Sequence, residues 1–356
     1  MKTNVRISAI AKDEGAYLVD WIFHHFYFGF DSIDIYINKT TDNSKEICNK
    51  LSNKFNIRVL DGDDFVTEYG GDFQKHVYEH AYNLAKEEGV TNLLFLDIDE
   101  FWTPRNFKTS IHEHLEENSH SDIICYEWGI PAHDSLPFST PFSEHQKILK
   151  NYHLKSLFKT SIDISVIGIH NVLSERATYV LADGSTPNFD EKNKATIIAT
   201  DTIGPLKEVF ILHRVARSQV EYVSLLGKGR PSTQNSLKNN RWGFIRANDG
   251  VDFSIIEEHI LDYKSKLSSL IDTLHLRKDI NEARCFVLER FKYVVDFIIN
   301  SGSHNIVIHQ NILKNITLPS VLFVINAVSS NAFVDIKSVY EFVASDLDKV
   351  DINKFN

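Results

Sequence analysis

The feature that most constrains this chain is an alternation of two hydrophobic periodicities along residues 1–100. Short β-branched or apolar runs, which predict strands, alternate with longer segments whose apolar residues recur at helical spacing. The predicted strands are residues 5–11, 32–38, 56–60 and 92–97, and the predicted helices are residues 14–28, 45–55 and 72–88. This order predicts an α/β fold with a mainly parallel sheet that helices cover on both faces.

The pattern changes along the rest of the chain. Residues 122–213 mix short predicted strands, such as 122–126 and 208–212, with irregular segments. Beyond about residue 248, residues 255–271 and 282–299 have the apolar spacing of long amphipathic helices. We therefore predict an α/β domain over residues 1–248 and a helical C-terminal region over residues 249–356.

Charge and cysteine content limit the partners and the compartment. The 356 residues carry a formal net charge of -10, which opposes binding of a nucleic-acid backbone, so no nucleic-acid partner is expected. A single nucleotide can still bind if a metal ion screens its phosphates. The 3 cysteines are far apart and odd in number, which argues against a disulfide framework and against a zinc cluster.

The compartment follows from the cysteines and from the absence of long apolar runs. The sequence begins without a signal-peptide pattern, and no run reaches the roughly 20 apolar residues that span a bilayer. We therefore expect a cytoplasmic protein, and a peripheral contact with the inner face of a membrane is left open.

Polar residues follow three of the predicted strands directly. They occupy residues 11–14, 38–42 and 97–100. In open α/β sheets, ligands bind beyond the carboxyl ends of the strands, so these three segments mark the expected site.

The most informative of these segments contains Asp97 and Asp99. On an extended backbone the two carboxylates would point to the same side while Ile98 points into the core. Two adjacent carboxylates repel each other unless a cation lies between them. Oxygen ligands suit Mg²⁺ or Mn²⁺, which keep positions open for phosphate oxygens and can neutralise a leaving diphosphate. The alternative is a solvated strand end with capping aspartates.

Four segments, taken in order, resemble family 2-like and family 92-like glycosyltransferases. The first is AIAKDEGAYLVDWIFHHFYFGFDSIDIYINKTTDNS, with Lys12-Asp13-Glu14, Trp21, His24-His25, Gly29, Asn38 and Asp42 as matching residues. The second is LLFLDIDEFW, which matches the metal-binding motif of those enzymes. The third and fourth are KSLFKTSIDISVIGIHN, residues 155–171, and LHRVARSQVEYVSLLGKGR, residues 212–230.

The resemblance implies a GT-A fold and a metal-dependent hexosyltransferase that uses a nucleotide-diphosphate sugar, with UDP-sugar as the expected donor. It further implies Mn²⁺ or Mg²⁺ as cofactor, inversion at the anomeric carbon, and a glycan or glycolipid acceptor in bacterial surface polysaccharide or lipopolysaccharide synthesis. By the same resemblance, Asp97 and Asp99 hold the metal–diphosphate. The residues expected around the nucleobase and ribose are Lys12, Asp13, Glu14, Asn38 and Asp42.

Other residues are weaker candidates. His213 follows a predicted strand and is a candidate metal ligand, as a neutral imidazole suits Mn²⁺; the alternative is a satisfied buried histidine, as it is for His170. Inversion needs a general base, for which Asp134 is preferred to Glu127, although either can be a solvated carboxylate.

A basic segment follows His213 and contains Arg214, Arg217, Lys228 and Arg230. Arg217 and Lys228 are predicted donor-binding residues, because cations can grip diphosphate oxygens. Gly227 and Gly229 would let the segment move as a lid. The alternative is a solvated basic face.

Two other functions compete with glycosyl transfer. An Asp-x-Asp after an apolar strand also opens haloacid dehalogenase-like phosphatases, in which the first Asp is a nucleophile. In this chain Glu100-Phe101 follows the pair and three predicted strands precede it, which favours the glycosyltransferase. The third alternative is a non-catalytic protein that binds a nucleotide or a carbohydrate on the same fold.

Overall fold

A computed structural model describes residues 3–132, 136–190, 206–229, 237–245, 250–330, 332, 334–348 and 350–353. The chain divides into two compact units that are not continuous in sequence. The first comprises Met1–Ala132, Pro141–Arg214 and Ala247–Arg277, and the second comprises His133–Thr140, Val215–Arg246 and Lys278–Asn356. The segment directly after residue 248 thus belongs to the first unit.

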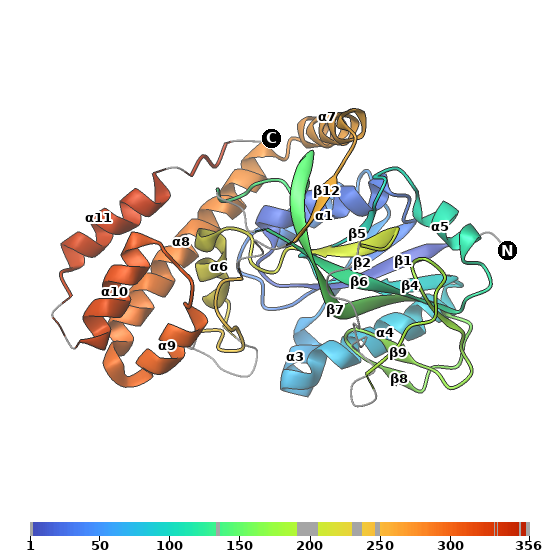
Figure 1. The fold of residues 1–356 in the computed structure, drawn as a ribbon, viewed down its shortest axis with the longest axis horizontal. Coiled ribbons are helices and arrows are strands. Elements are labelled where there is room, and N and C mark those ends of the chain that lie inside the picture. The colour runs from blue at the N-terminus through green and yellow to red at the C-terminus, as the bar shows by residue number, and fades with distance from the viewer. Residues whose placement is uncertain are drawn as a thin grey trace. The chain divides into compact units, whose positions relative to one another are not determined.

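The first unit is built on one large mixed sheet with the strand order β3-β2-β1-β4-β7-β6-β11-β5 (Figure 1). Two further strands join it, because β10 pairs with β6 and β12 pairs with β7, while β8 and β9 form a small separate hairpin. The strands are β1 (Val5–Ala11), β2 (Ser32–Ile37), β3 (Ile57–Asp61), β4 (Asn92–Phe95), β5 (Glu100–Pro104), β6 (Ile123–Pro131), β7 (His145–Lys159), β8 (Val166–Ile167), β9 (Val172–Leu173), β10 (Tyr179–Leu181), β11 (Val209–His213) and β12 (Val251–Ser254).

The half of this sheet from β3 to β4 is wholly parallel, and in the other half β7 runs antiparallel to β4 and β6. Parallel neighbours need crossovers, and helices supply them. The helices of the first unit are α1 (Gly15–Tyr27), α2 (Ser44–Leu51), α3 (Asp63–Tyr69), the 3₁₀ turn Gly70–Asp72, α4 (Phe73–Glu87), α5 (Ile111–Glu117) and α7 (Glu257–Thr273). The predicted fold class, an α/β sheet flanked by helices, is confirmed.

Helices α1 and α4 lie on opposite sides of this sheet (Figure 1). On the α4 side, Val77, Tyr78 and Ala81 pack with Leu93 and Phe95 of β4 in one buried cluster. The Tyr78 ring stacks on Phe95 with centroids 4.1 Å apart. Because both faces are covered, β2 is buried along its whole length, although its sequence alternates apolar and polar residues.

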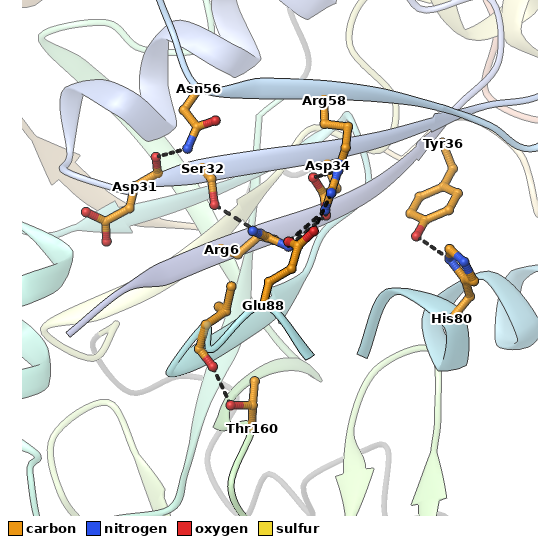
Figure 2. A network of polar contacts seen from close by, with 11 residues as sticks. Arg6, Asp31, Ser32, Asp34, Tyr36, Asn56, Arg58, His80, Glu88 and Thr160 are labelled. Atoms are coloured by element: carbon orange, nitrogen blue, oxygen red, sulfur yellow. Dashed lines mark hydrogen bonds and ion pairs between the residues drawn. The ribbon is translucent and has the colours of Figure 1, made fainter. Parts of the chain in front are cut away.

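The burial of β2 puts the Asp34 carboxylate inside the protein, where an unpaired charge would be very costly. Figure 2 shows how it is satisfied. Asp34 Oδ2 lies 3.3 Å from Arg6 Nη1 of β1 and 2.8 Å from Arg58 Nη2 of β3. Both arginines also reach Glu88, each at 2.6 Å. The network therefore ties the three strands together and joins them to the end of α4.

Helix α1 is hydrogen-bonded to the backbone of β5, the last strand in the sheet order. Trp21 Nε1 donates to the Glu100 carbonyl at 2.7 Å, and His24 Nε2 lies 2.8 Å from the Trp102 carbonyl. The Trp102 amide donates to His25 Nε2 at 3.3 Å. In the described sheet β5 pairs with β11 along one edge, and these aromatic residues of α1 form hydrogen bonds with its other edge.

The second unit is helical and has its own core. It contains α6 (Gln219–Leu226), α8 (Arg277–Ser301), the 3₁₀ turn Gly302–Asn305, α9 (Ile306–Ile312), α10 (Pro319–Ser329) and α11 (Ile336–Leu347). Val223, Leu226, Phe291 and Val294 are among its fully buried residues. In the described part of the chain, no helix is both long enough and apolar enough to cross a membrane.

Candidate functional site

The predicted polar segments meet at one edge of the sheet. Strand β1 pairs in parallel with β2 on one side and β4 on the other, so the carboxyl ends of the three strands lie together. Lys12 to Glu14 follow β1, Asn38 follows β2, and the Asp97–Glu100 turn follows β4. The Asn38 amide donates to the Ala11 carbonyl at 3.1 Å, and the Leu96 amide donates to the Ser8 carbonyl at 3.2 Å.

Two of the predicted donor-binding aspartates hold the loops of this edge in shape. Asp13 has a positive φ of 51°, and its Oδ1 accepts the Thr41 amide at 2.8 Å. Asp42 Oδ2 accepts the Gly15 amide at 2.8 Å, and its Oδ1 accepts the Ser44 amide at 3.0 Å. Burial raises the pKa of Asp42, against these hydrogen bonds. The loop after β1 and the loop after β2 are thus joined by hydrogen bonds into one wall.

Asn38 has a different environment from these aspartates. It is only 2 % exposed, and its Oδ1 has no hydrogen-bond partner among the residues that the structure describes. A buried carbonyl oxygen without a partner costs about 1–3 kcal/mol. Such an atom at a ligand-binding edge fits a site that a hydrogen-bond donor on a ligand would complete.

The carboxylate pair lies in a turn, and not on an extended strand as the sequence suggested. Strand β4 ends at Phe95, and residues 98–99 form a turn before β5 begins at Glu100. The Glu100 amide donates to the Asp97 carbonyl at 3.0 Å to close it. Ile98 is buried as predicted, whereas the side chains of Asp97 and Asp99 are 37 % and 20 % exposed. Both carboxylates therefore reach solvent from one tight turn.

His213 lies beside Asp99, because β11 pairs antiparallel with β5 and sets His213 opposite Glu100. His213 Nε2 is 3.6 Å from Asp99 Oδ1, and the Arg214 amide donates to the Asp99 carbonyl at 2.8 Å. Burial disfavours the charged imidazole, but Asp99, Glu100 and Asp97 together outweigh burial and raise the pKa of His213. His213 Nδ1 has no hydrogen-bond partner within the described residues.

A cation that the sequence argument missed lies under the turn. Lys155 of β7 is fully buried, and its Nζ lies 3.2 Å from Asp97 Oδ2, 3.1 Å from Glu100 Oε2 and 3.3 Å from the Ile169 carbonyl. Burial lowers the pKa of Lys155, but Asp97 and Glu100 outweigh it and raise the pKa above its ordinary value. Burial raises the pKa of Glu100 to about 7, while Lys155 acts in the opposite direction. The buried Glu100 carboxylate therefore lies beside the Lys155 ammonium beneath the turn.

Next to His213 the structure gathers aromatic and imidazole rings around Trp128 of β6. The Trp128 ring centroid lies 4.1 Å from that of His213, 4.9 Å from His153 and 5.2 Å from His170. Burial lowers the pKa of His170 to about 4. In the described structure, Trp128 Nε1 and His170 Nδ1 have no hydrogen-bond partner. The cluster therefore presents polar ring atoms without internal partners.

Of the two candidate bases, Glu127 lies within the described residues and Asp134 does not. Glu127 Oε1 lies 3.2 Å from Lys150 Nζ, and both side chains are nearly buried. Its other oxygen, Oε2, has no hydrogen-bond partner in the described part of the chain. Asp134 lies outside the described residues. Both assignments stay predictions.

The basic segment is divided between the two units. Arg214 is buried in the first unit, whereas Arg217 and Lys228 belong to the second, and Arg230 lies outside the described residues. Gly227 ends α6, and a Cβ at this position would meet Arg290 and Val294 of α8 at 2.9 Å. Its lack of a side chain thus has a packing reason. The donor contacts predicted for Arg217 and Lys228 stay predictions.

Asp99 and His213 are spaced as two ligands of one metal ion would be. Among the described residues, no group of three or more His, Cys, Asp or Glu side chains is arranged to hold a metal ion. Asp99 Oδ1 and His213 Nε2 are 3.6 Å apart. Two ligands of one ion, each bound at roughly 2.1 Å, lie within about 4 Å of each other. The pair therefore fits an ion whose remaining ligands are water and diphosphate oxygens.

The known proteins to which this chain is similar are all distant in sequence and in structure. No family model and no curated protein matches the sequence. Among solved structures, HddC from Yersinia pseudotuberculosis is 10% identical with a TM-score of 0.30, over 51% of this chain and 89% of that one. The S. aureus TarS 1–349 complex with UDP is 12% identical with a TM-score of 0.32, over 97% and 90% of the two chains.

A third similar structure is the Mn/GDP-form of core-mannan synthase A from Aspergillus fumigatus. It is 10% identical with a TM-score of 0.24, over 38% of this chain and 45% of that one. Similarity this distant does not indicate a function, so the function of this chain has to be inferred from its own residues.

Proposed function

We propose that this chain is a metal-dependent glycosyltransferase that moves a sugar from a nucleotide-diphosphate donor, expected to be a UDP-sugar, to a glycan or glycolipid acceptor. The observation that carries the proposal is the meeting of Asp97, Asp99 and His213 at the carboxyl edge of the sheet, the same edge at which Asn38 follows β2. This edge is where an open α/β sheet binds its ligand.

The nucleotide end of the donor would lie against the wall formed by the loops after β1 and β2. Asn38 Oδ1 would accept a hydrogen bond from the nucleobase or ribose, because it has no partner in the described structure. Asp13 and Asp42 would act mainly by fixing the wall, since their carboxylates bind backbone amides of the opposite loop. Lys12 and Glu14 keep the donor-binding role that the resemblance implies.

The diphosphate end would lie at the Asp97–Glu100 turn. Asp99 and His213 would hold the divalent ion, and Asp97 would add an oxygen to the same ligand set. When bound, such an ion neutralises the charge that develops on the leaving nucleoside diphosphate. The chain's own contribution is to hold the two ligands 3.6 Å apart at the ends of β11 and the turn, so that little rearrangement is needed on binding.

The acceptor would approach the Trp128 side of the site. Orphan polar atoms on Trp128 and His170 suit a ligand with many hydroxyl groups, and an aromatic face suits a sugar ring. Inversion requires a base for the acceptor hydroxyl, and we propose Asp134 or Glu127 for this role. Glu127 offers Oε2, while the Lys150 contact holds its other oxygen.

The family and the biological setting are proposed from the four sequence segments alone. They favour a family 2-like or family 92-like enzyme of bacterial surface polysaccharide or lipopolysaccharide synthesis. A cytoplasmic location, with contact to the inner face of the membrane where the acceptor is a lipid, agrees with that setting.

The test is a donor-hydrolysis screen of the full chain with UDP- and GDP-sugars, with Mn²⁺ and with excess chelator. We expect release of nucleoside diphosphate from one donor only when the metal is present, because the diphosphate leaves poorly without charge neutralisation. Equal release in chelator would overturn the metal role. Turnover of p-nitrophenyl phosphate without sugar-nucleotide turnover would support the phosphatase, and nucleotide binding without any turnover would support a non-catalytic protein.

A further inference from the structure

Lys155 is a buried ammonium whose place the sequence motifs did not explain. Its side chain is 1 % exposed, and lysine is almost never buried unless it is paired. An ammonium has three N–H donors, and three acceptors surround this one: Asp97 Oδ2, Glu100 Oε2 and the Ile169 carbonyl. The group is thus fixed in direction as well as in position.

Asp97 is tied to Lys155 by two routes. Its carboxylate contacts the ammonium directly at 3.2 Å. Its backbone amide donates at 2.8 Å to Glu100 Oε2, the same oxygen that lies 3.1 Å from Lys155. Glu100 is itself 0 % exposed and cannot turn to solvent. Both the backbone and the side chain of Asp97 are therefore held from beneath by one cation.

The contact also gives the two oxygens of Asp97 different environments. Oδ2 faces the buried ammonium, and the side chain remains 37 % exposed on its other side. A carboxylate free to rotate would lose side-chain entropy on binding a ligand, whereas one already fixed does not. The positive charge beneath the turn also offsets part of the repulsion among Asp97, Asp99 and Glu100.

From this geometry we propose that Lys155 is a positioning residue for the donor site: it acts through Asp97, fixing that carboxylate so that it presents one oxygen to the divalent ion that would hold the nucleoside diphosphate. The inference rests on the proposed function, because it presumes that Asp97 belongs to the metal–diphosphate site. It assigns Lys155 no contact with the donor.

The test is a double-mutant cycle on binding of UDP in the presence of Mn²⁺, or of the nucleoside diphosphate selected by the hydrolysis screen, measured by calorimetry. Lys155→Met should weaken binding by roughly tenfold, the size of a coupling between residues in contact. In a chain that already carries Asp97→Asn, Lys155→Met should add little further loss. Additive losses would overturn the proposal, because they would mean that Lys155 does not act through Asp97.

Lys159→Met is the matched control. Lys159 lies on the same strand and lies 3.3 Å from both a carboxylate oxygen of Asp122 and the Ser119 carbonyl. Its replacement should leave the affinity for UDP unchanged. If Lys159→Met lowered the affinity for UDP as much as Lys155→Met does, both effects would reflect damage to β7, and the proposal would be overturned.

A second variant separates positioning from folding, because Lys155→Met leaves the buried Glu100 carboxylate without its cation. Lys155→Met combined with Glu100→Gln removes one charge of each sign and should restore thermal stability. Binding should stay weak in this double variant if Lys155 positions Asp97. Recovery of both stability and affinity would reduce Lys155 to a structural role. Failure of the wild type to bind or hydrolyse any sugar nucleotide would instead remove the proposed function, and the inference with it.

Discussion

At the scale of single residues, the polar groups of the site differ in what already binds them. Asp13 and Asp42 are engaged by backbone amides, and Asp97 is engaged by Lys155. Asp99 faces His213 at 3.6 Å, a distance that leaves room for an ion between them. Residue type alone did not separate these aspartates; their partners do.

The prediction at this scale concerns Asp99. Asp99→Asn keeps the shape of the side chain and removes its charge, so the fold should survive while the metal loses an anionic ligand. We expect donor hydrolysis to fall by roughly a hundredfold or more, as when a group that stabilises transition-state charge is removed. Rates with Mn²⁺ and thermal unfolding by circular dichroism check both parts, with Asp163→Asn, an exposed aspartate of the same unit, as control. Full activity, or an unfolded variant, would contradict the assigned role.

At the scale of elements, α1 and β5 are joined by buried imidazoles. His24 is 0 % exposed, bonds the Trp102 carbonyl and stacks on Phe142 with centroids 4.8 Å apart. Burial lowers the pKa of His24 to about 3 from an ordinary 6.5, although the Trp102 carbonyl acts in the opposite direction. The pKa of His25 is lowered by burial as well. The native state thus keeps both rings neutral.

A pH dependence of stability follows. Below pH 6.5 His24 binds a proton in the unfolded chain, whereas in the native state it binds one only near pH 3. Stability from this group is therefore fully present above pH 6.5 and is lost as the pH falls toward 3. The free energy of unfolding of the wild type, measured with urea, should fall between pH 8 and pH 5. The His24→Phe variant should be less stable than the wild type at pH 8 by about 1 kcal/mol. Its free energy of unfolding should nevertheless fall less on acidification. His120→Asn, at an exposed position, should leave the slope unchanged; an unchanged slope in His24→Phe would contradict the assignment.

At the scale of the whole molecule, the described residues include one core between α4 and the mixed sheet and another among the helices of the second unit. Gly227 belongs to the second. A Cβ there would come within 2.9 Å of Arg290 and Val294, closer than ordinary contacts allow. The glycine thus lets α6 end against α8, which is a reason for its presence that needs no moving lid.

The corresponding prediction compares two glycine substitutions. Gly227→Ala should destabilise the second unit by about 1–3 kcal/mol, because α8 must shift to admit the methyl group. Gly71→Ala, where a Cβ would meet nothing within 4 Å, should be close to neutral. Calorimetric unfolding of both variants checks this. If Gly227→Ala unfolds like the wild type, the contact with α8 does not restrict that position. The interpretation that Gly227 allows the basic segment to move as a lid would then be favoured.

The sequence by itself determined the parallel half of the sheet and the edge at which the candidate site lies. Strands β1 to β4 and helices α1, α2 and α4 were predicted within a few residues, because periodicities of two and of 3.6 are local properties of the chain. The rule that ligands bind at the carboxyl ends of parallel strands then placed Asn38, Asp97 and Asp99 at one edge. Helix α3, strand β5 and the long strand β7 were not predicted.

Tertiary structure alone decided which groups meet at that edge. Lys155 reaches Asp97 across 58 positions of sequence because β7 pairs antiparallel with β4, and His213 reaches Asp99 because β11 pairs with β5. Such pairings join segments far apart, so neither has a local pattern. Lys155 begins the third segment of the resemblance and lies between Leu154 and Leu157 in a strand-like run, but neither feature distinguishes a buried lysine from one on an exposed strand face. Burial distinguishes the two cases, and burial is set by what packs above the strand.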